Sequence, residues 1–160
     1  HEVKRIDVAQ LEFPLLRTKE EFEKGTPPDS IKQAQDAIRW ADHLVIFYPL
    51  WLGSMPALLK AFLEQVFRPG VAFEYRAQGK MAKKLFTGKS ARIVVTMGMP
   101  ALVYRWFFLA HSLKSLERNI LAFCGIKPTR ATLIGQVEGM NERQRASWLD
   151  EMRGLGDVGK

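Results

Sequence analysis

The hydrophobic pattern between residues 43 and 67 predicts a buried strand followed by a helix. Residues 44–48 are five apolar residues in a row, which is typical of a strand covered on both faces, as in a parallel sheet. Ser54 is then a suitable N-cap, with Pro56 near the first helical position. Apolar residues recur from there at the three- and four-residue spacing of a helix with one buried face (55, 58, 59, 62, 63, 66 and 67).

The rest of the chain alternates between strand and helix patterns. Apolar alternation or short apolar runs predict strands at 3–8, 91–96 and 129–137. Helical spacing predicts one helix opening at 28–30, one ending at Gly125, and a last one over 141–155 that packs Trp148 and Met152. Residues 68–89 are expected to form a long loop with a short extended element at 73–75. This order predicts an α/β three-layer sandwich with right-handed crossovers.

Two loops that follow buried strands are the candidate site. Residues 49–53 and 96–100 both combine glycine with bulky apolar side chains, and open α/β sheets bind ligands at the carboxyl ends of their strands. Glycine allows the backbone to approach a ligand closely, and Trp51 offers a flat face to a ring. A planar heteroaromatic ligand therefore suits these loops. The spacing alone leaves an alternative equally open, in which both loops are tight turns with their large side chains in the core.

Length and charge narrow the class of protein. The chain of 160 residues fits one domain and contains no run of the about 20 apolar residues that a membrane span needs. The net charge of +7 favours anionic ligands, but the basic residues are scattered and no nucleic-acid-binding motif accompanies them, so a solvated surface is preferred to nucleic-acid binding. The single cysteine, Cys124, is predicted to be a buried structural thiol, which suits a reducing, cytoplasmic compartment.

Other chemistries have little support in the sequence. There is no nucleophile elbow, no P-loop and no G-x-G-x-x-G segment. His1, His43 and His111 lie far apart without ligand spacing, so no metal site is expected. His111 follows Tyr104 by about two helical turns, so the pair could reach one cleft, although a surface or interface role for His111 is the simpler interpretation.

Several short motifs are shared with one known family. The most specific is Y-P-L-W at 48–51 followed by G-S-M-P-A-L-L-K at 53–60. Supporting motifs are E-Q-V-F at 64–67, A-F-E-Y at 72–75, L-F-T-G-K at 85–89 and F-C-G-I-K at 123–127. Together they resemble the NAD(P)H:quinone oxidoreductase family of flavodoxin-like flavoproteins, over residues 2 to about 155.

The resemblance implies a fold, a cofactor and a reaction. The fold would be a twisted five-stranded parallel sheet of order 2-1-3-4-5 with FAD or FMN at the carboxyl ends of the strands. The reaction would pass hydride from NAD(P)H through flavin N5 to a quinone-like acceptor in a ping-pong cycle, in a homodimer with each site at the subunit interface. Small members of the family also serve as ancillary subunits of potassium efflux systems, and this alternative stays open.

The resemblance also implies the roles of site residues. By position, four residues would line the flavin ring: Pro49, Leu50, Trp51 and Leu52. Four would contact its polar edge through backbone N–H groups: Thr96, Met97, Gly98 and Met99. Tyr104 would flank the ring, and Tyr104 and His111 would be the catalytic proton donors or charge stabilisers. Met97 and Met99 depart from the threonine- and glycine-rich loop that is usual in the family.

The beginning of the chain departs most from the family pattern. Family members have a strand, a phosphate-binding loop and a helix before the strand expected here at 3–8. We therefore expect the single domain, residues 1–160, to be incomplete at its N-terminus by about 20 to 30 residues, enough for a strand and a helix. The alternative is that a rearrangement or a partner replaces the missing strand. Direct pairing of Val3 with Leu44 would contradict the expectation of an incomplete domain.

Overall fold

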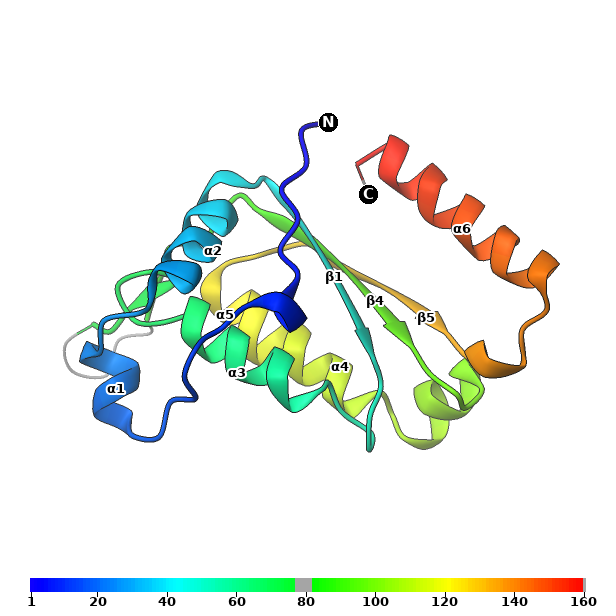
Figure 1. Cartoon of the computed structure of the whole chain (residues 1–160), viewed down its shortest axis with the longest axis horizontal. Helices are drawn as coiled ribbons and strands as arrows, with labels where there is room; N and C mark the ends of the chain where they lie inside the picture. Colours follow the sequence, from blue (N-terminus) through cyan, green and yellow to red (C-terminus); the bar gives the residue numbers. More distant parts are fainter. Residues whose placement is uncertain (77–81, 160) are drawn as a thin grey trace.

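A three-stranded parallel sheet with helices on both faces forms the centre of the molecule (Figure 1). The computed structural model describes residues 1–76 and 82–159. The strands are β1 (His43–Pro49), β4 (Ser90–Thr96) and β5 (Thr129–Ile134), in the order β1-β4-β5. Both pairings are parallel along the whole of the shared length, which confirms the predicted α/β class.

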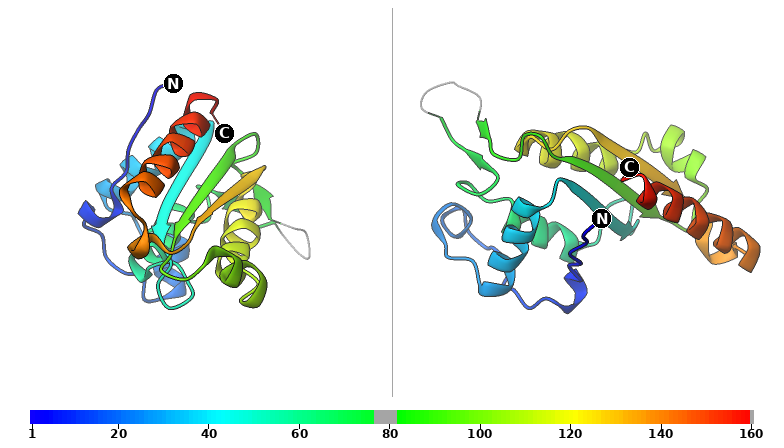
Figure 2. Two further views of the ribbon diagram at one scale, coloured as in Figure 1. Left: turned by 90° about the vertical axis from the view of Figure 1, so that its right-hand side faces the viewer. Right: turned by 90° about the horizontal axis from the view of Figure 1, so that it is seen from above.

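Helices of very different length cover the two faces of this sheet. Figures 1 and 2 show helices on one face that come from the crossovers, and α6 on the other face. The first face carries α2 (Asp29–Trp40), α3 (Ala57–Val66) and a continuous helical run of α4 (His111–Ser115), η3 (Leu116–Leu121) and α5 (Ala122–Cys124). The second carries α6 (Glu142–Asp157). Short elements complete the description: η1 (Val8–Gln10), α1 (Lys19–Lys24), β2 (Phe73–Glu74), β3 (Lys83–Lys84), η2 (Val103–Phe107) and η4 (Val137–Gly139).

Local sequence signals explain where the longer helices start and stop. The helical run after β4 ends at Gly125, which has a left-handed φ of 104° that favours glycine. At α6, Asn141 forms the predicted cap as a full capping box, because its side chain and the Gln144 side chain each bond the other residue's backbone N–H. The end of the first helical run at Gly125 and the start of α6 at Asn141 were both predicted from the sequence.

The two faces of the sheet are covered unequally. On β1, Tyr48 is buried against the crossover helices, whereas Val45 and Phe47 point to the other side and are 49% and 63% exposed. Helix α6 buries no residue completely, and the predicted packing of Trp148 and Met152 is realised only as half-burial. The core therefore lies between the sheet and the crossover helices, and the prediction that residues 44–48 are covered on both faces was wrong for Val45 and Phe47.

Three further predictions about local structure were wrong. Residues 3–8 form no strand, because they pair with no strand among the described residues, and Ile6 and Val8 pack loosely on the core instead. Ser54 does not cap α3, since it closes a turn with Trp51 and leaves Pro56 as the N-cap. The last strand ends at Ile134 rather than at residue 137.

The outer edge of β1 has no neighbouring strand in the part of the chain that the structure describes. Pairing of Val3 with Leu44 would have contradicted the expectation of an incomplete domain. The two residues do not pair. An exposed strand edge offers unpaired backbone groups to another strand. The five-strand order and the incomplete N-terminus therefore stay predictions.

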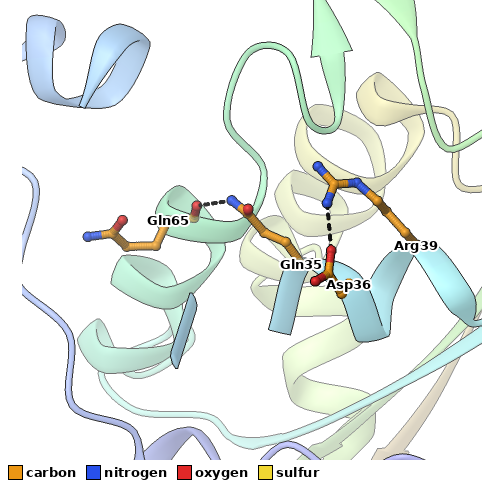
Figure 3. Close-up of polar contacts among 4 residues, drawn as sticks. All are labelled: Gln35, Asp36, Arg39 and Gln65. Atoms are coloured by element: carbon orange, nitrogen blue, oxygen red, sulfur yellow. Dashed lines mark hydrogen bonds and ion pairs between the residues drawn. The ribbon is translucent and has the colours of Figure 1, made fainter. Parts of the chain in front are cut away.

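Polar side chains attach the N-terminal loops to the helical layer. Gln35 on α2 donates to the backbone oxygen of Gln65 in the last turn of α3, at 3.1 Å (Figure 3). This oxygen lies among the last carbonyls of a helix, which lack an intrahelical partner. The Gln65 side chain points away from Gln35 and donates to the Pro14 oxygen at 2.6 Å. Arg68, also buried, donates to the Glu21 and Gly25 oxygens.

Candidate functional site

The two loops predicted as the site lie side by side at one end of the sheet. Pro49 and Thr96 are the last paired residues of β1 and β4. Immediately beyond them the Leu50 N–H donates to the Thr96 oxygen at 2.7 Å. Because the strands are parallel, both loops start at the same carboxyl edge, which is where open α/β sheets bind ligands. The lower end of the sheet in Figure 1 is this edge.

The first loop contains a tight two-residue turn. Trp51 and Ser54 exchange two backbone hydrogen bonds, each 2.9 Å long, around Leu52 and Gly53. Both central residues have positive φ, 48° and 77°, as in a type I′ turn. The left-handed region is unfavourable for a leucine, and such strain is often kept at functional sites. The Leu52 side chain is fully exposed, so burial of that side chain does not account for the strain.

The second loop is fixed by the sheet and still presents backbone donors. The Met97 N–H donates to the Ile134 oxygen at 2.9 Å, so one of the N–H groups predicted to face a ligand is already used. Gly98 and Met99 have no hydrogen-bond partner for their N–H groups among the described residues, and the same is true of Leu52 and Gly53 in the first loop. Each loop therefore presents two adjacent free donors.

A third turn, which the sequence analysis missed, holds the second loop from the side of β5. The Gln136 N–H donates to the Met99 oxygen at 3.1 Å, and the Val137 N–H donates to the Met97 oxygen at 3.2 Å. Gly135 makes this contact possible, because a Cβ there would lie 2.4 Å from the Ala101 nitrogen. The available signal was a glycine inside the segment predicted as the last strand, because a glycine within a strand often marks a place where another backbone approaches closely.

The sequence spacing left two alternatives open for these loops: they bind a planar ligand, or they are tight turns with their large side chains in the core. The exposure of the side chains distinguishes between them. Trp51 is 61% exposed, so the first loop is not a turn with its aromatic residue in the core. Met97 is 3% exposed and does fill the core, whereas Met99 is half-buried. An exposed indole and four free N–H groups, all from loops at one edge of the sheet, suit a flat ring whose edge carries carbonyl oxygens and ring nitrogens. The residues present therefore fit the ring of a flavin.

Tyr104 lies inside the protein rather than on the wall of an open site. It is 1% exposed, and its hydroxyl shares a 2.7 Å hydrogen bond with the Ser112 hydroxyl and accepts the Leu113 N–H at 3.2 Å. This arrangement ties η2 to the start of α4. The predicted partner, His111, is exposed at the first position of α4. The structure thus places the two residues on adjoining elements but not in one cleft.

The Tyr48 side chain lies on the core side of β1. The Tyr48 hydroxyl is buried without a hydrogen-bond partner among the described residues, and burial raises the Tyr48 pKa, with Tyr104 and Glu117 adding to the effect. Burial also raises the pKa of Glu117, while Arg118 and Lys114 lower it. The Tyr48 phenol is therefore neutral at physiological pH and cannot serve as an anionic group.

The described residues offer little support for other kinds of site. They contain no group of three or more His, Cys, Asp or Glu side chains placed to hold a metal ion. Among them, none of the helices is both long and apolar enough to cross a bilayer. A groove of about 980 Å³ lies at the amino end of β5, bordered by Lys84, Glu117 and Lys127. It is at the end of the strand opposite to the three turns, and we assign it no role.

Known proteins match most of this chain. The model of the family with the flavodoxin-like fold matches residues 1–154. An uncharacterized NAD(P)H oxidoreductase of Haemophilus influenzae is 27% identical over 148 residues, which cover 90% of this chain and 72% of that protein. The FMN-dependent NADH:quinone oxidoreductase 1 of Hahella chejuensis is 35% identical over 114 residues, or 64% of this chain and 52% of that protein. The chain thus spans about half to three-quarters of these relatives.

A solved structure supports the same relationship. The crystal structure of Smu.1420 from Streptococcus mutans superposes with a TM-score of 0.71 at 29% identity, covering 93% of this chain and 75% of that one. Agreement over nearly the whole chain means that the order of strands and crossover helices described above is shared with that protein.

Proposed function

The chain belongs to the family with the flavodoxin-like fold, and from this premise we propose that it is a flavin-dependent NAD(P)H oxidoreductase acting on a quinone-like acceptor. The observation that carries the proposal is the pair of turns at the carboxyl edge, which together offer an exposed indole and four free N–H groups. The oxidoreductase names of the two relatives support it, and the FMN-dependent relative favours FMN over FAD.

Each turn has a separate task in this proposal. A bound flavin would supply the hydride chemistry between NAD(P)H and the acceptor. Pro49, Leu50, Trp51 and Leu52 form the apolar wall against the ring. The N–H groups of Gly98 and Met99 would hold its polar edge, while Thr96 and Met97 hold that loop against β1 and β5. Fixed N–H donors stabilise negative charge on a bound ring at no cost of reorganisation.

Tyr104 and His111 take different roles in the proposal. His111 is exposed and donates a proton from its imidazole to the reduced acceptor. Tyr104, buried and bonded to Ser112, acts as a positioning residue that fixes the start of α4, where His111 lies. His111→Gln should lower turnover, and Tyr104→Phe should lower it less, because His111 is retained in that variant. A Tyr104→Phe protein that is less active than the His111→Gln protein would contradict the positioning role.

Two further parts of the proposal concern the state of the protein. We propose a homodimer with the site at its interface, in which a second copy covers the side of the site formed by Trp51 and Leu52. We also propose a cytoplasmic location, where the lone Cys124 stays reduced. Light scattering after size exclusion tests the dimer. A protein that stays monomeric at high concentration, with and without flavin, would contradict it.

The decisive experiment is a titration of the purified chain with FMN and with FAD, followed by NADH and NADPH oxidation with menadione as acceptor. We expect a yellow complex and menadione-dependent oxidation of the nicotinamide. Trp51→Ala should weaken flavin binding about tenfold through the lost contact with the ring. Trp40→Ala is the matched control, since Trp40 is also exposed but lies at the end of α2 beneath Lys4.

The outcomes separate the enzyme from the ancillary subunit. A folded chain that takes up neither flavin would overturn the proposal. A chain that binds flavin but oxidises no nicotinamide with any quinone would favour the ancillary, regulatory role. The relatives reported above are named as oxidoreductases, which favours the enzyme.

A further inference from the structure

One acidic side chain lies against the backbone donors of the candidate site. Glu138 is exposed on η4, the turn directly beyond the end of β5 (Figure 1). One of its carboxylate oxygens lies 3.8 Å from the position that a Cβ on Gly98 would take, and Gly98 carries one of the free N–H groups of the second loop. A ring atom that accepts this N–H at about 2.9 Å therefore lies within about 9 Å of the Glu138 carboxylate.

Backbone hydrogen bonds on both sides of Glu138 fix its place in the fold. The Val137 N–H donates to the Met97 oxygen at 3.2 Å, and the Gly139 N–H donates to the Gln136 oxygen at 3.1 Å. Gln136 has a left-handed φ of 56°, which is unfavourable for a residue other than glycine. Strain of this type persists only where the surrounding structure imposes it. The turn therefore holds Glu138 beside the second loop.

Glu138 is the one acidic residue in the three segments that follow the strands at this edge, and Arg105 is the one basic residue; the segments are 49–56, 96–110 and 135–141. No lysine or arginine in the described part of the chain forms an ion pair with Glu138. A carboxylate beside N–H donors disfavours a ligand edge that is anionic when it binds, such as a phosphate. It is compatible with an edge that is neutral on binding and becomes negative afterwards.

We propose that Glu138 lowers the reduction potential of a flavin ring held at this edge, by opposing negative charge on the reduced ring. The inference rests on the proposed function, because it needs a flavin at the carboxyl edge. A hydride brings two electrons and one proton to a neutral ring, so the ring gains one negative charge unless it takes up a further proton. The Gly98 and Met99 N–H groups stabilise that charge and the Glu138 carboxylate repels it. Glu138 thereby makes the reduced ring a stronger donor to the acceptor.

A purely structural role for Glu138 predicts a different result. The reduction potential of a bound flavin depends on the ratio of the affinities for its reduced and oxidised forms. A side chain that only supported the loop would change both affinities by the same factor and leave the potential unchanged. A solvated charge without influence on the ring would change neither affinity. The potential therefore distinguishes the electrostatic role from both of these.

The test is the midpoint potential of FMN bound to the chain, measured at neutral pH by equilibration with a reference dye. Glu138→Gln removes the charge and keeps the shape. It should raise the affinity for reduced FMN, relative to oxidised FMN, about fivefold, which is about 20 mV for a two-electron couple. Glu138→Lys should raise the potential further, and Glu138→Asp should leave it nearly unchanged. The shift in Glu138→Gln should shrink when salt rises from about 0.1 M to about 1 M, because the Debye length falls from about 10 Å to about 3 Å.

Glu151→Gln is the matched control, because Glu151 is also exposed, lies beyond the middle of α6 and loses the same charge in this variant. Its FMN potential should equal that of the unchanged chain, and circular dichroism with a melting curve shows that each variant is folded. An unchanged or lowered potential in Glu138→Gln would overturn this inference and leave the oxidoreductase proposal in place. So would an equal shift in Glu151→Gln, because net charge would then be the cause. A folded chain that takes up no flavin would overturn both proposals, so the two failures are distinguishable.

Discussion

Gly135→Ala is the most direct test of whether close packing at Gly135 positions the loop of the candidate site. Gly135 follows β5 and packs against the loop that carries Gly98 and Met99. An added Cβ would lie 2.4 Å from the Ala101 nitrogen and 2.8 Å from the Met99 oxygen, and both atoms belong to the backbone. An ordinary contact begins near 3.4 Å, so the loop must move by about 1 Å (3.4 minus 2.4). No side chain can rotate to relieve this contact.

The expected cost has two parts that can be measured separately. Overpacking of this size costs about 2 kcal/mol of unfolding free energy. In a domain of this length each kcal/mol lowers Tm by about 3 °C, so Gly135→Ala should melt about 6 °C lower. A 1 Å displacement of the Gly98 and Met99 N–H groups should also weaken FMN binding at least about tenfold, which is about 1.4 kcal/mol. Melting curves and flavin fluorescence titrations give the two values.

Two neighbouring glycines provide the controls. A Cβ at Gly139 would meet nothing within 4 Å, so Gly139→Ala should leave both Tm and FMN affinity unchanged. At Gly98 the nearest atoms are 3.8 Å away, so Gly98→Ala should keep its Tm and lose affinity only if FMN approaches that backbone closely. The reasoning would be refuted by a Gly135→Ala protein whose Tm and FMN affinity both equal those of the unchanged chain.

Three further predictions concern other parts of the fold. Leu52→Asn creates the Asn-Gly sequence favoured in type I′ turns and should raise Tm by about 3 °C, through about 1 kcal/mol of relieved strain; a lower Tm would contradict this. Burial, with Arg92 and Arg130, lowers the pKa of His43 below 6.5, so the unfolded chain binds the extra proton and stability is lost as pH falls below about 6.5. Urea unfolding above and below that pH should show this loss, and His43→Gln should lack it; an equal loss in the variant would exclude His43 as the cause. Burial raises the pKa of Cys124 to about 12, so its thiol should react with a disulfide reagent only on unfolding, and rapid reaction of the native protein would contradict the structure.

Local sequence signals predicted those strands and helices whose ends and buried faces depend on residues nearby in the sequence. The apolar run at 44–48 and the helical spacing after residue 55 correspond to β1 and α3, and the caps at Gly125 and Asn141 are where they were expected. The pairing of the loops after β1 and β4 also followed from topology, since parallel strands bring their carboxyl ends to one edge. These predictions needed only periodicity, capping preferences and the rule for crossovers.

Where a prediction depended on a neighbour distant in sequence, it was incomplete or wrong. Residues 3–8 alternate as a strand does, but a strand forms only when a second strand accepts its backbone hydrogen bonds. The burial of the Tyr104 hydroxyl depends on Ser112 and Leu113 across a bend that no pattern announces.

The sequence by itself determined the α/β order, the strand–turn–helix unit at the carboxyl edge and the family resemblance, because each is encoded by residues within about one or two turns of one another. The tertiary structure alone decided which N–H groups at that edge stay free. It also decided that Gly135 supports the site, that Tyr104 is buried and that Trp106 and Phe107 are exposed. The physical reason is that hydrogen-bond satisfaction and close packing are set by contacts between segments, and hydrophobic periodicity does not record those contacts.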